Sequence, residues 1–145
     1  MKTIFKTAVL SLACVLPLVS CEDDTRTLRN ETTDDVIWSS VELTAANWEK
    51  CADRQGLNTY YRCSVRTSAI NYQVLNGGMV NCYLYDGNAQ AQLPSVRHYE
   101  NAQNQFWTRT IDYEYYNGGV TFYVTDSDFA GEKPGVLTFR LMVAF

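Results

Sequence analysis

The chain has 145 residues, of which 12 are Lys or Arg and 16 are Asp or Glu, so its formal net charge is −4 at pH 7. An acidic chain lacks the basic surface with which proteins bind nucleic acid, and nucleic acid is therefore not an expected partner. The length suits one domain with its own hydrophobic core, with residues left over for a short segment outside it.

The first 20 residues are predicted to be an export signal rather than part of the fold. Lys2 and Lys6 flank the start of an apolar stretch that continues to Leu18, which matches the basic and apolar regions of a secretory signal peptide. A transmembrane helix needs about 20 apolar residues, so this stretch is too short to span a bilayer. A signal peptide at residues 1–20 is the interpretation that follows.

The end of this apolar stretch, Leu18-Val19-Ser20-Cys21, resembles the lipobox of bacterial lipoproteins. In that family signal peptidase cuts before the cysteine, and the cysteine carries the lipid. The resemblance therefore implies that Cys21 is lipidated and that acyl chains hold the protein at a membrane. The alternative is an ordinary secretory signal with a small-residue cleavage site.

Residues 21–35 are expected to be an acidic, flexible tether. From Glu22 to Asp35 the only aliphatic residue is Leu28, and such a segment cannot bury enough apolar surface to offset the entropy lost on ordering. Residues 36–145 are then the folded domain.

Alternating apolar and polar residues predict two strands in the first half of this domain, Val36 to Thr44 and Thr59 to Arg66, separated by a loop. Between Ser68 and Gly77 the apolar spacing changes to that of a short helix, with Ser68 as N-cap and Gly77 in the left-handed position after the last turn. Each strand has one face toward the core, formed by the following residues: Ile37, Ser39, Val41 and Leu43, then Tyr61, Cys63 and Val65.

The second half continues with strands. Alternation returns from Met79 to Tyr85, with Val80, Cys82 and Leu84 inward, and Gln92 to Val96 is predicted to be a short edge segment because Pro94 cannot donate to a central ladder. Asn117-Gly118 between residues 105–116 and 120–126 predicts a β-hairpin with a type I′ turn. A last alternating strand has core positions Leu137, Phe139, Leu141, Val143 and Phe145.

The cysteines of the folded part allow a disulfide. Cys51, Cys63 and Cys82 remain after Cys14 and Cys21 are assigned to the signal and the lipid. Cys63 and Cys82 both lie on predicted core faces, which makes them the first choice for a bridge, with the other two pairings left open. A metal site and a catalytic cysteine are disfavoured because His98 is the chain's single histidine.

These elements predict an all-β fold. About seven strands, turn signals between them, one short helix near residues 68–76 and no βαβ rhythm favour an antiparallel, Ig-like β-sandwich. A small barrel is the alternative.

The order of short motifs along the domain resembles that of small Bacteroidetes lipoproteins, mostly of unknown function. The motifs are Leu75-Asn76-Gly77-Gly78-Met79-Val80-Asn81-Cys82-Tyr83-Leu84-Tyr85, then Gln92-Leu93-Pro94, then the Tyr-rich hairpin, then Phe139-Arg140-Leu141-Met142-Val143. The resemblance implies attachment to the outer membrane, on the periplasmic side or facing outward at the cell surface. It supplies no catalytic residues.

Two groups of polar residues are candidate sites. Asp112 and Glu114 lie two apart on a predicted strand and share a face, and glycoside hydrolysis uses a pair of carboxylates. Asp126-Ser127-Asp128 resembles the opening of a calcium loop, although the later ligands of an EF-hand are missing. A solvated stripe and a solvated loop are the alternatives, and no cofactor or metal is expected.

The aromatic content is the stronger signal. Among 10 Tyr and 3 Trp residues, four fall on outward faces: Trp38, Tyr60, Tyr83 and Tyr85. Exposed aromatic rings stack on sugars or anchor protein interfaces, and the alternative is that they pair with Arg or Tyr across strands. The sequence favours a non-enzymatic module that binds a glycan or an envelope protein. The alternatives are an accessory or structural subunit of an outer-membrane complex and, less favoured, a glycoside hydrolase.

Overall fold

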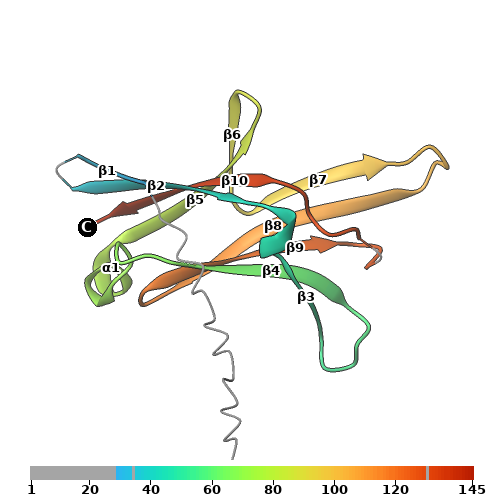
Figure 1. Ribbon diagram of the computed structural model, residues 1–145, viewed down its shortest axis with the longest axis horizontal. Coiled ribbons are helices and arrows are strands. Elements are labelled where there is room, and N and C mark those ends of the chain that lie inside the picture. Colours follow the sequence, from blue (N-terminus) through green and yellow to red (C-terminus); the bar gives the residue numbers. More distant parts are fainter. Residues whose placement is uncertain (1–28, 34, 130) are drawn as a thin grey trace, which may run out of the picture.

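The computed structural model describes residues 29–33, 35–129 and 131–145, so the predicted signal peptide and Cys21 lie outside the described residues. The described residues form two antiparallel sheets of five strands each, packed face to face, with a short helix at one end (Figure 1). The predicted all-β sandwich is confirmed. Among these residues no helix is both long and apolar enough to cross a bilayer.

The first sheet has the strand order β1-β2-β10-β5-β6. Its strands are β1 (Arg29–Thr33), β2 (Val36–Leu43), β10 (Leu137–Ala144), β5 (Met79–Asp86) and β6 (Ala89–Gln92). The second sheet has the order β3-β4-β9-β8-β7. Its strands are β3 (Glu49–Ala52), β4 (Thr59–Arg66), β9 (Gly119–Asp126), β8 (Phe106–Tyr116) and β7 (Ser95–Glu100).

The structure has more strands than expected, and the additional ones lie at sheet edges. Strands β1, β3 and β6 are four or five residues long and each forms an outer strand of its sheet. An edge strand needs only backbone pairing on one side, so its sequence need not alternate. Residues 29–33, expected to belong to the tether, therefore pair with β2 as β1.

The core lies between the two sheets and centres on their middle strands. Phe122 of β9 and Phe139 of β10 are both fully buried, and their rings stack with centroids 4.1 Å apart. Trp48 follows the 3-10 helix η1 (Ala45–Asn47), and its ring packs edge-to-face with that of Phe139, with the ring centroids 6.3 Å apart. Because large aromatic side chains contribute most when they are buried, the stacked pair of Phe122 and Phe139 is a main source of stability.

The inward faces predicted from alternation are confirmed for β2, β4, β5 and β10. Their core positions are buried or pack against the core: Ile37, Ser39, Val41, Leu43, Tyr61, Cys63, Val65, Val80, Cys82, Leu84, Leu137, Phe139, Leu141 and Val143. Phe145 was expected to continue this row, but it follows the end of β10 and is 55% exposed. The prediction for Phe145 is wrong because the sheet ends before it.

The predicted helix is present, with different caps. It is α1 (Tyr72–Gly77), and its N-cap is Asn71, whose side-chain oxygen accepts hydrogen bonds from the N–H groups of Gln73 and Val74. Asn is as good an N-cap as Ser, so the nearer residue replaces Ser68. Gly77 is the last helical residue rather than a left-handed one.

The predicted hairpin is present as β8 and β9, but its turn is held by the neighbouring loop. Gly118 has φ +93°, whereas Asn117 is not among the residues with positive φ, so the turn is not type I′. The Gly118 N–H donates to the Ile70 carbonyl at 2.8 Å, and the Gly118 carbonyl accepts from the Thr67 N–H at 3.0 Å. These contacts from the segment before α1 select the turn conformation.

The predicted Cys63–Cys82 disulfide is absent, because Cys82 carries a free thiol. Cys63 lies on β4 of the second sheet and Cys82 on β5 of the first, where they stand opposite Phe122 and Leu141. Facing sheets are about 10 Å apart, whereas the Cα atoms of a disulfide lie within about 7 Å. Both residues lie on core faces, but these faces belong to different sheets, so the two cysteines are not close enough to form a disulfide.

Candidate functional site

Three of the four aromatic residues singled out in the sequence gather on the outer face of the first sheet. Trp38 lies on β2, and Tyr83 and Tyr85 lie on β5, on either side of the central strand β10. All three are partly exposed. We call these residues, together with Arg140 of β10, the aromatic face.

Arg140 links the aromatic residues across the sheet. Its guanidinium carbon is 4.2 Å from the centre of the Trp38 ring, and the Trp38 and Tyr83 ring centroids are 6.1 Å apart. Arg140 also stands directly opposite Tyr83 in the β10–β5 ladder. The cross-strand pairing with Arg or Tyr, which is the alternative to a binding role, is thus present. It holds the rings in place and leaves part of each one exposed.

Amide side chains border the tyrosines of the aromatic face. In the β5–β6 ladder Gln92 stands opposite Tyr83 and Gln90 opposite Tyr85. The Gln92 Nε2 donates to Asn81 Oδ1 at 3.3 Å. Each amide carries both donors and acceptors, so this border can hydrogen-bond a ligand lying on the rings.

Tyr60 is the residue that does not join this group. It lies on β4 of the second sheet, where its ring centroid is 6.0 Å from that of Tyr123. Alternation identifies an outward residue but not the sheet to which its strand belongs. Tyr60 therefore does not share a surface with Trp38, Tyr83 and Tyr85.

Asp112 and Glu114 are close to Tyr60 and Tyr123, around an open depression of about 510 Å³ on the outer face of the second sheet. The Tyr123 hydroxyl donates to Glu114 Oε2 at 2.9 Å. Partial burial raises the pKa of Asp112, and the negative charge of Glu114 raises it further. Both carboxylates project from one strand, side by side, whereas glycoside hydrolysis needs a pair that flanks the bond to be cut.

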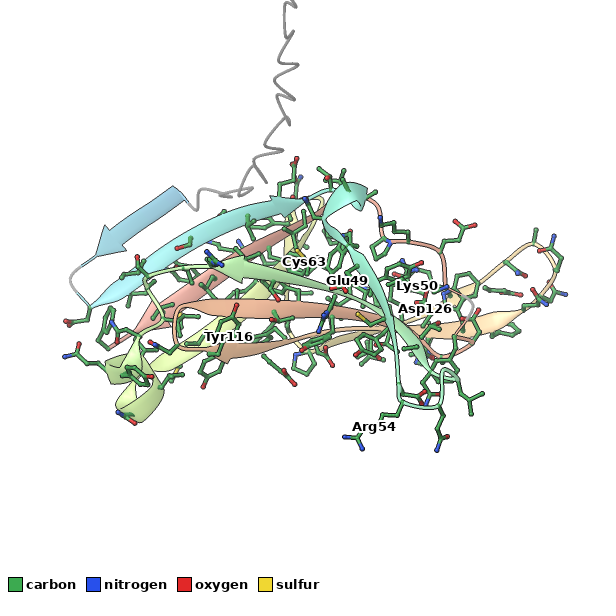
Figure 2. All side chains as sticks on the ribbon, turned by 60° about the horizontal axis from the view of Figure 1, so that its bottom comes forward. Glu49, Lys50, Arg54, Cys63, Tyr116 and Asp126 are labelled. Atoms are coloured by element: carbon green, nitrogen blue, oxygen red, sulfur yellow. The ribbon has the colours of Figure 1, made fainter. Side chains whose placement is uncertain are left out.

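A larger concavity, which sequence reasoning missed, lies at the end of the sandwich remote from α1. This end cleft has a volume of about 730 Å³, and its lining includes Trp107, Arg109 and Asp126. The β7–β8 hairpin extends beyond the first sheet at this end (Figure 1). Figure 2 shows Asp126 and Tyr116 towards opposite ends of the β8–β9 hairpin. Because Trp107 and Arg109 continue the inward row of Ile111, their exposure could be recognised only once the length of each sheet was known.

A bidentate ion pair forms one wall of the end cleft. Arg109 donates from Nε to Asp126 Oδ1 at 2.7 Å and from Nη2 to Asp126 Oδ2 at 2.8 Å. The Asp126 hydrogen bond is the main reason that the pKa of Arg109 is raised. Both carboxylate oxygens of Asp126 thus accept hydrogen bonds from Arg109, and the calcium interpretation of this loop receives no support. The described residues contain no group of three or more His, Cys, Asp or Glu placed to hold a metal.

His98 has a structural partner on the neighbouring strand. Its Nδ1 lies 2.9 Å from the Thr108 hydroxyl across the β7–β8 ladder, and the residue is exposed.

Comparisons of the chain with family models, curated proteins and solved structures found no match.

Proposed function

We propose that this protein is a non-catalytic, glycan-binding module of the bacterial envelope or cell surface, attached to the outer membrane by lipid on Cys21. The observation that supports binding is the aromatic face, where Trp38, Tyr83 and Tyr85 are partly exposed on one side of a sheet. The lipid anchor rests on the lipobox resemblance of residues 18–21.

The chemistry of the aromatic face suits a sugar chain. The faces of pyranose rings carry C–H groups that pack on aromatic rings, and their edges carry hydroxyls that need donors and acceptors. Trp38 and Tyr83 supply rings 6.1 Å apart, while Gln90 and Gln92 stand opposite the two tyrosines. Arg140 holds Trp38 in place before any ligand arrives, which reduces the entropy lost on binding.

Glycan binding is tested by titrating the protein with a panel of oligosaccharides. We expect Tyr83→Ala and Tyr85→Ala each to weaken binding at least tenfold, which corresponds to about 1.4 kcal/mol. Tyr72→Ala is the matched control, because Tyr72 is 69% exposed on α1, outside the first sheet. Wild-type affinity in folded Tyr83→Ala and Tyr85→Ala proteins would exclude the aromatic face. If no glycan binds, a protein partner becomes the better proposal, and crosslinking in intact cells would search for it.

Lipid attachment is tested by labelling cells that express the full chain with a palmitate analogue. We expect the wild-type protein to incorporate label and to sediment with membranes, and Cys21→Ala to do neither. Cys14→Ala is the control, since Cys14 lies within the predicted signal peptide. Equal labelling of Cys21→Ala and wild type would contradict the proposed anchor.

A further inference from the structure

We propose that the end cleft is a second binding site, separate from the aromatic face, and that it takes an uncharged sugar residue. The cleft has the size and the mixed lining of a ligand site, since such sites have volumes of about 300 to 1,000 Å³ and combine aromatic surface with a few fixed polar groups. Its volume is about 730 Å³.

The aromatic surface of the cleft is held before binding. The Trp107 ring stacks on Tyr99 of β7 with centroids 5.5 Å apart and an interplanar angle of 16°. The Arg109 guanidinium lies 5.8 Å from the centre of the same Tyr99 ring. Trp107 is partly exposed and lines the cleft. A ring fixed in this way loses little further freedom when a sugar packs on it.

The polar groups of the cleft are also fixed. Arg109 uses Nε and one hydrogen of Nη2 for Asp126, and a guanidinium carries five N–H donors in all. The Asp126 carboxylate keeps lone pairs beyond those that accept from Arg109. Arg109 is partly exposed whereas Asp126 is buried, so the pair presents guanidinium donors, held in place by the carboxylate, to a sugar hydroxyl in the cleft.

The charge of the lining selects against anionic ligands. Arg109 is accompanied by three carboxylates, those of Asp126, Asp128 and Glu132, and Asp128 lies close enough to raise the pKa of Arg109. The excess negative charge repels uronic acids and sulfated sugars. A neutral sugar residue avoids this repulsion.

The test uses the full chain carrying Tyr83→Ala, so that the aromatic face does not contribute to binding. This protein and its end-cleft variants are titrated with maltohexaose, cellohexaose, xylohexaose and mannohexaose as neutral probes, and with hexagalacturonate as an anionic probe of equal length. We expect at least one neutral hexasaccharide to bind and hexagalacturonate to bind at least tenfold more weakly. We expect Trp107→Ala to lower the affinity for the neutral hexasaccharide at least tenfold. Leu57→Ala is the control, since Leu57 is 68% exposed and does not line the cleft.

Further variants keep the inference testable if Trp107→Ala fails to fold. Phe106 is 73% exposed and lines the cleft, so we expect Phe106→Ala to fold and to bind the neutral hexasaccharide more weakly. The double variant Asp128→Asn with Glu132→Gln is expected to strengthen hexagalacturonate binding at least threefold. Unchanged binding in Phe106→Ala, no change in charge selectivity, or no binding of any neutral hexasaccharide would each overturn the inference.

The results can overturn either proposed site without overturning the other. Loss of all hexasaccharide binding in Tyr83→Ala would overturn the second site and leave the aromatic face supported. Wild-type affinity in Tyr83→Ala that is lost when an end-cleft substitution is added would exclude the aromatic face and support the end cleft.

Discussion

Cys82 illustrates how the sandwich interior changes the chemistry of one side chain. Burial raises its pKa from 9.0 to about 12, and the residue has no exposed surface. The Tyr113 hydroxyl reaches across from the second sheet to donate to the Val80 carbonyl at 3.0 Å, two residues away from Cys82. The thiolate is the reactive form of cysteine, so a buried thiol with a raised pKa is inert.

We therefore predict that iodoacetamide at pH 8 modifies Cys51 in the native protein and spares Cys82. Cys51 is partly exposed on the edge strand β3, and Cys82 is expected to react only after unfolding in guanidinium chloride. Mass spectrometry of peptides from native and unfolded samples measures both rates. Equal rates for the two cysteines in the native protein would contradict the buried position of Cys82.

The raised pKa of Cys82 also predicts a pH dependence of stability. The unfolded chain releases the Cys82 proton near pH 9, whereas the folded chain retains it to about pH 12. The folded state thus binds more protons in this window, and the free energy of unfolding falls as pH rises from about 9 to about 12. Urea titrations at several pH values should show a smaller fall for Cys82→Ala than for wild type. An identical fall in both proteins would refute this assignment.

Asp112 predicts an effect in the opposite range of pH. Its pKa is raised by burial and by Glu114, so its ionised form destabilises the folded state at neutral pH and its protonated form does not. Asp112→Asn should therefore be more stable than wild type at pH 7, with the advantage vanishing below about pH 3.8, the ordinary pKa of Asp. Glu114→Gln provides the comparison, because that residue accepts a hydrogen bond from Tyr123. A less stable Asp112→Asn at pH 7 would contradict the account.

At the scale of single elements, the β8–β9 turn requires glycine for its backbone rather than for space. Gly118 has φ +93° and an added Cβ would meet nothing within 4 Å. We predict that Gly118→Ala lowers the free energy of unfolding by about 1 to 2 kcal/mol, the cost of a left-handed conformation for an L-residue.

Gly77 is the matched control for this substitution. It ends α1, an added Cβ would again meet nothing within 4 Å, and its φ is not in the left-handed range. Gly77→Ala should be neutral or stabilise the protein by about 0.4 to 1 kcal/mol. Urea denaturation measures both variants, and equal effects would show that the backbone conformation of Gly118 is not the cause.

The elements show what local pattern can predict. Alternation located β4 and the two arms of the hairpin, because one side of each strand faces the core. Counting back from Asn117-Gly118 would also have placed Arg109 opposite Asp126, as the structure has them. Strands β1, β3 and β6 were missed because backbone pairing at an edge leaves no apolar pattern.

For the whole molecule, the stacked pair at the centre predicts where stability is concentrated. Phe139 is fully buried against Phe122 and Trp48, and Phe139→Ala should cost about 3 to 5 kcal/mol through lost burial and a cavity. Phe145→Ala removes the same side chain from a position 55% exposed and should have little effect. Comparable losses in the two variants, measured by denaturant unfolding, would contradict a core centred on β9 and β10.

The candidate sites could be predicted only in part, because they depend on how strands combine. Outward aromatic residues were recognised one strand at a time, so Trp38 and Tyr83 were correctly placed outward, whereas the sheet to which Tyr60 belongs could not be known. Arg109 follows the inward row of β8, and its position in a cleft arises because the β7–β8 hairpin is longer than the sheet facing it. No local pattern carries that information.

The most direct test of the proposed function is NMR mapping of the amide signals of the protein during titration with the tightest-binding oligosaccharide. We expect saturable shifts that cluster on β2, β10 and β5 around Trp38, Arg140 and Tyr83, and we expect this cluster of shifts to disappear in Tyr83→Ala. Shifts confined to α1 and the β8–β9 turn, or no shifts at millimolar ligand, would contradict the aromatic face as a glycan-binding surface.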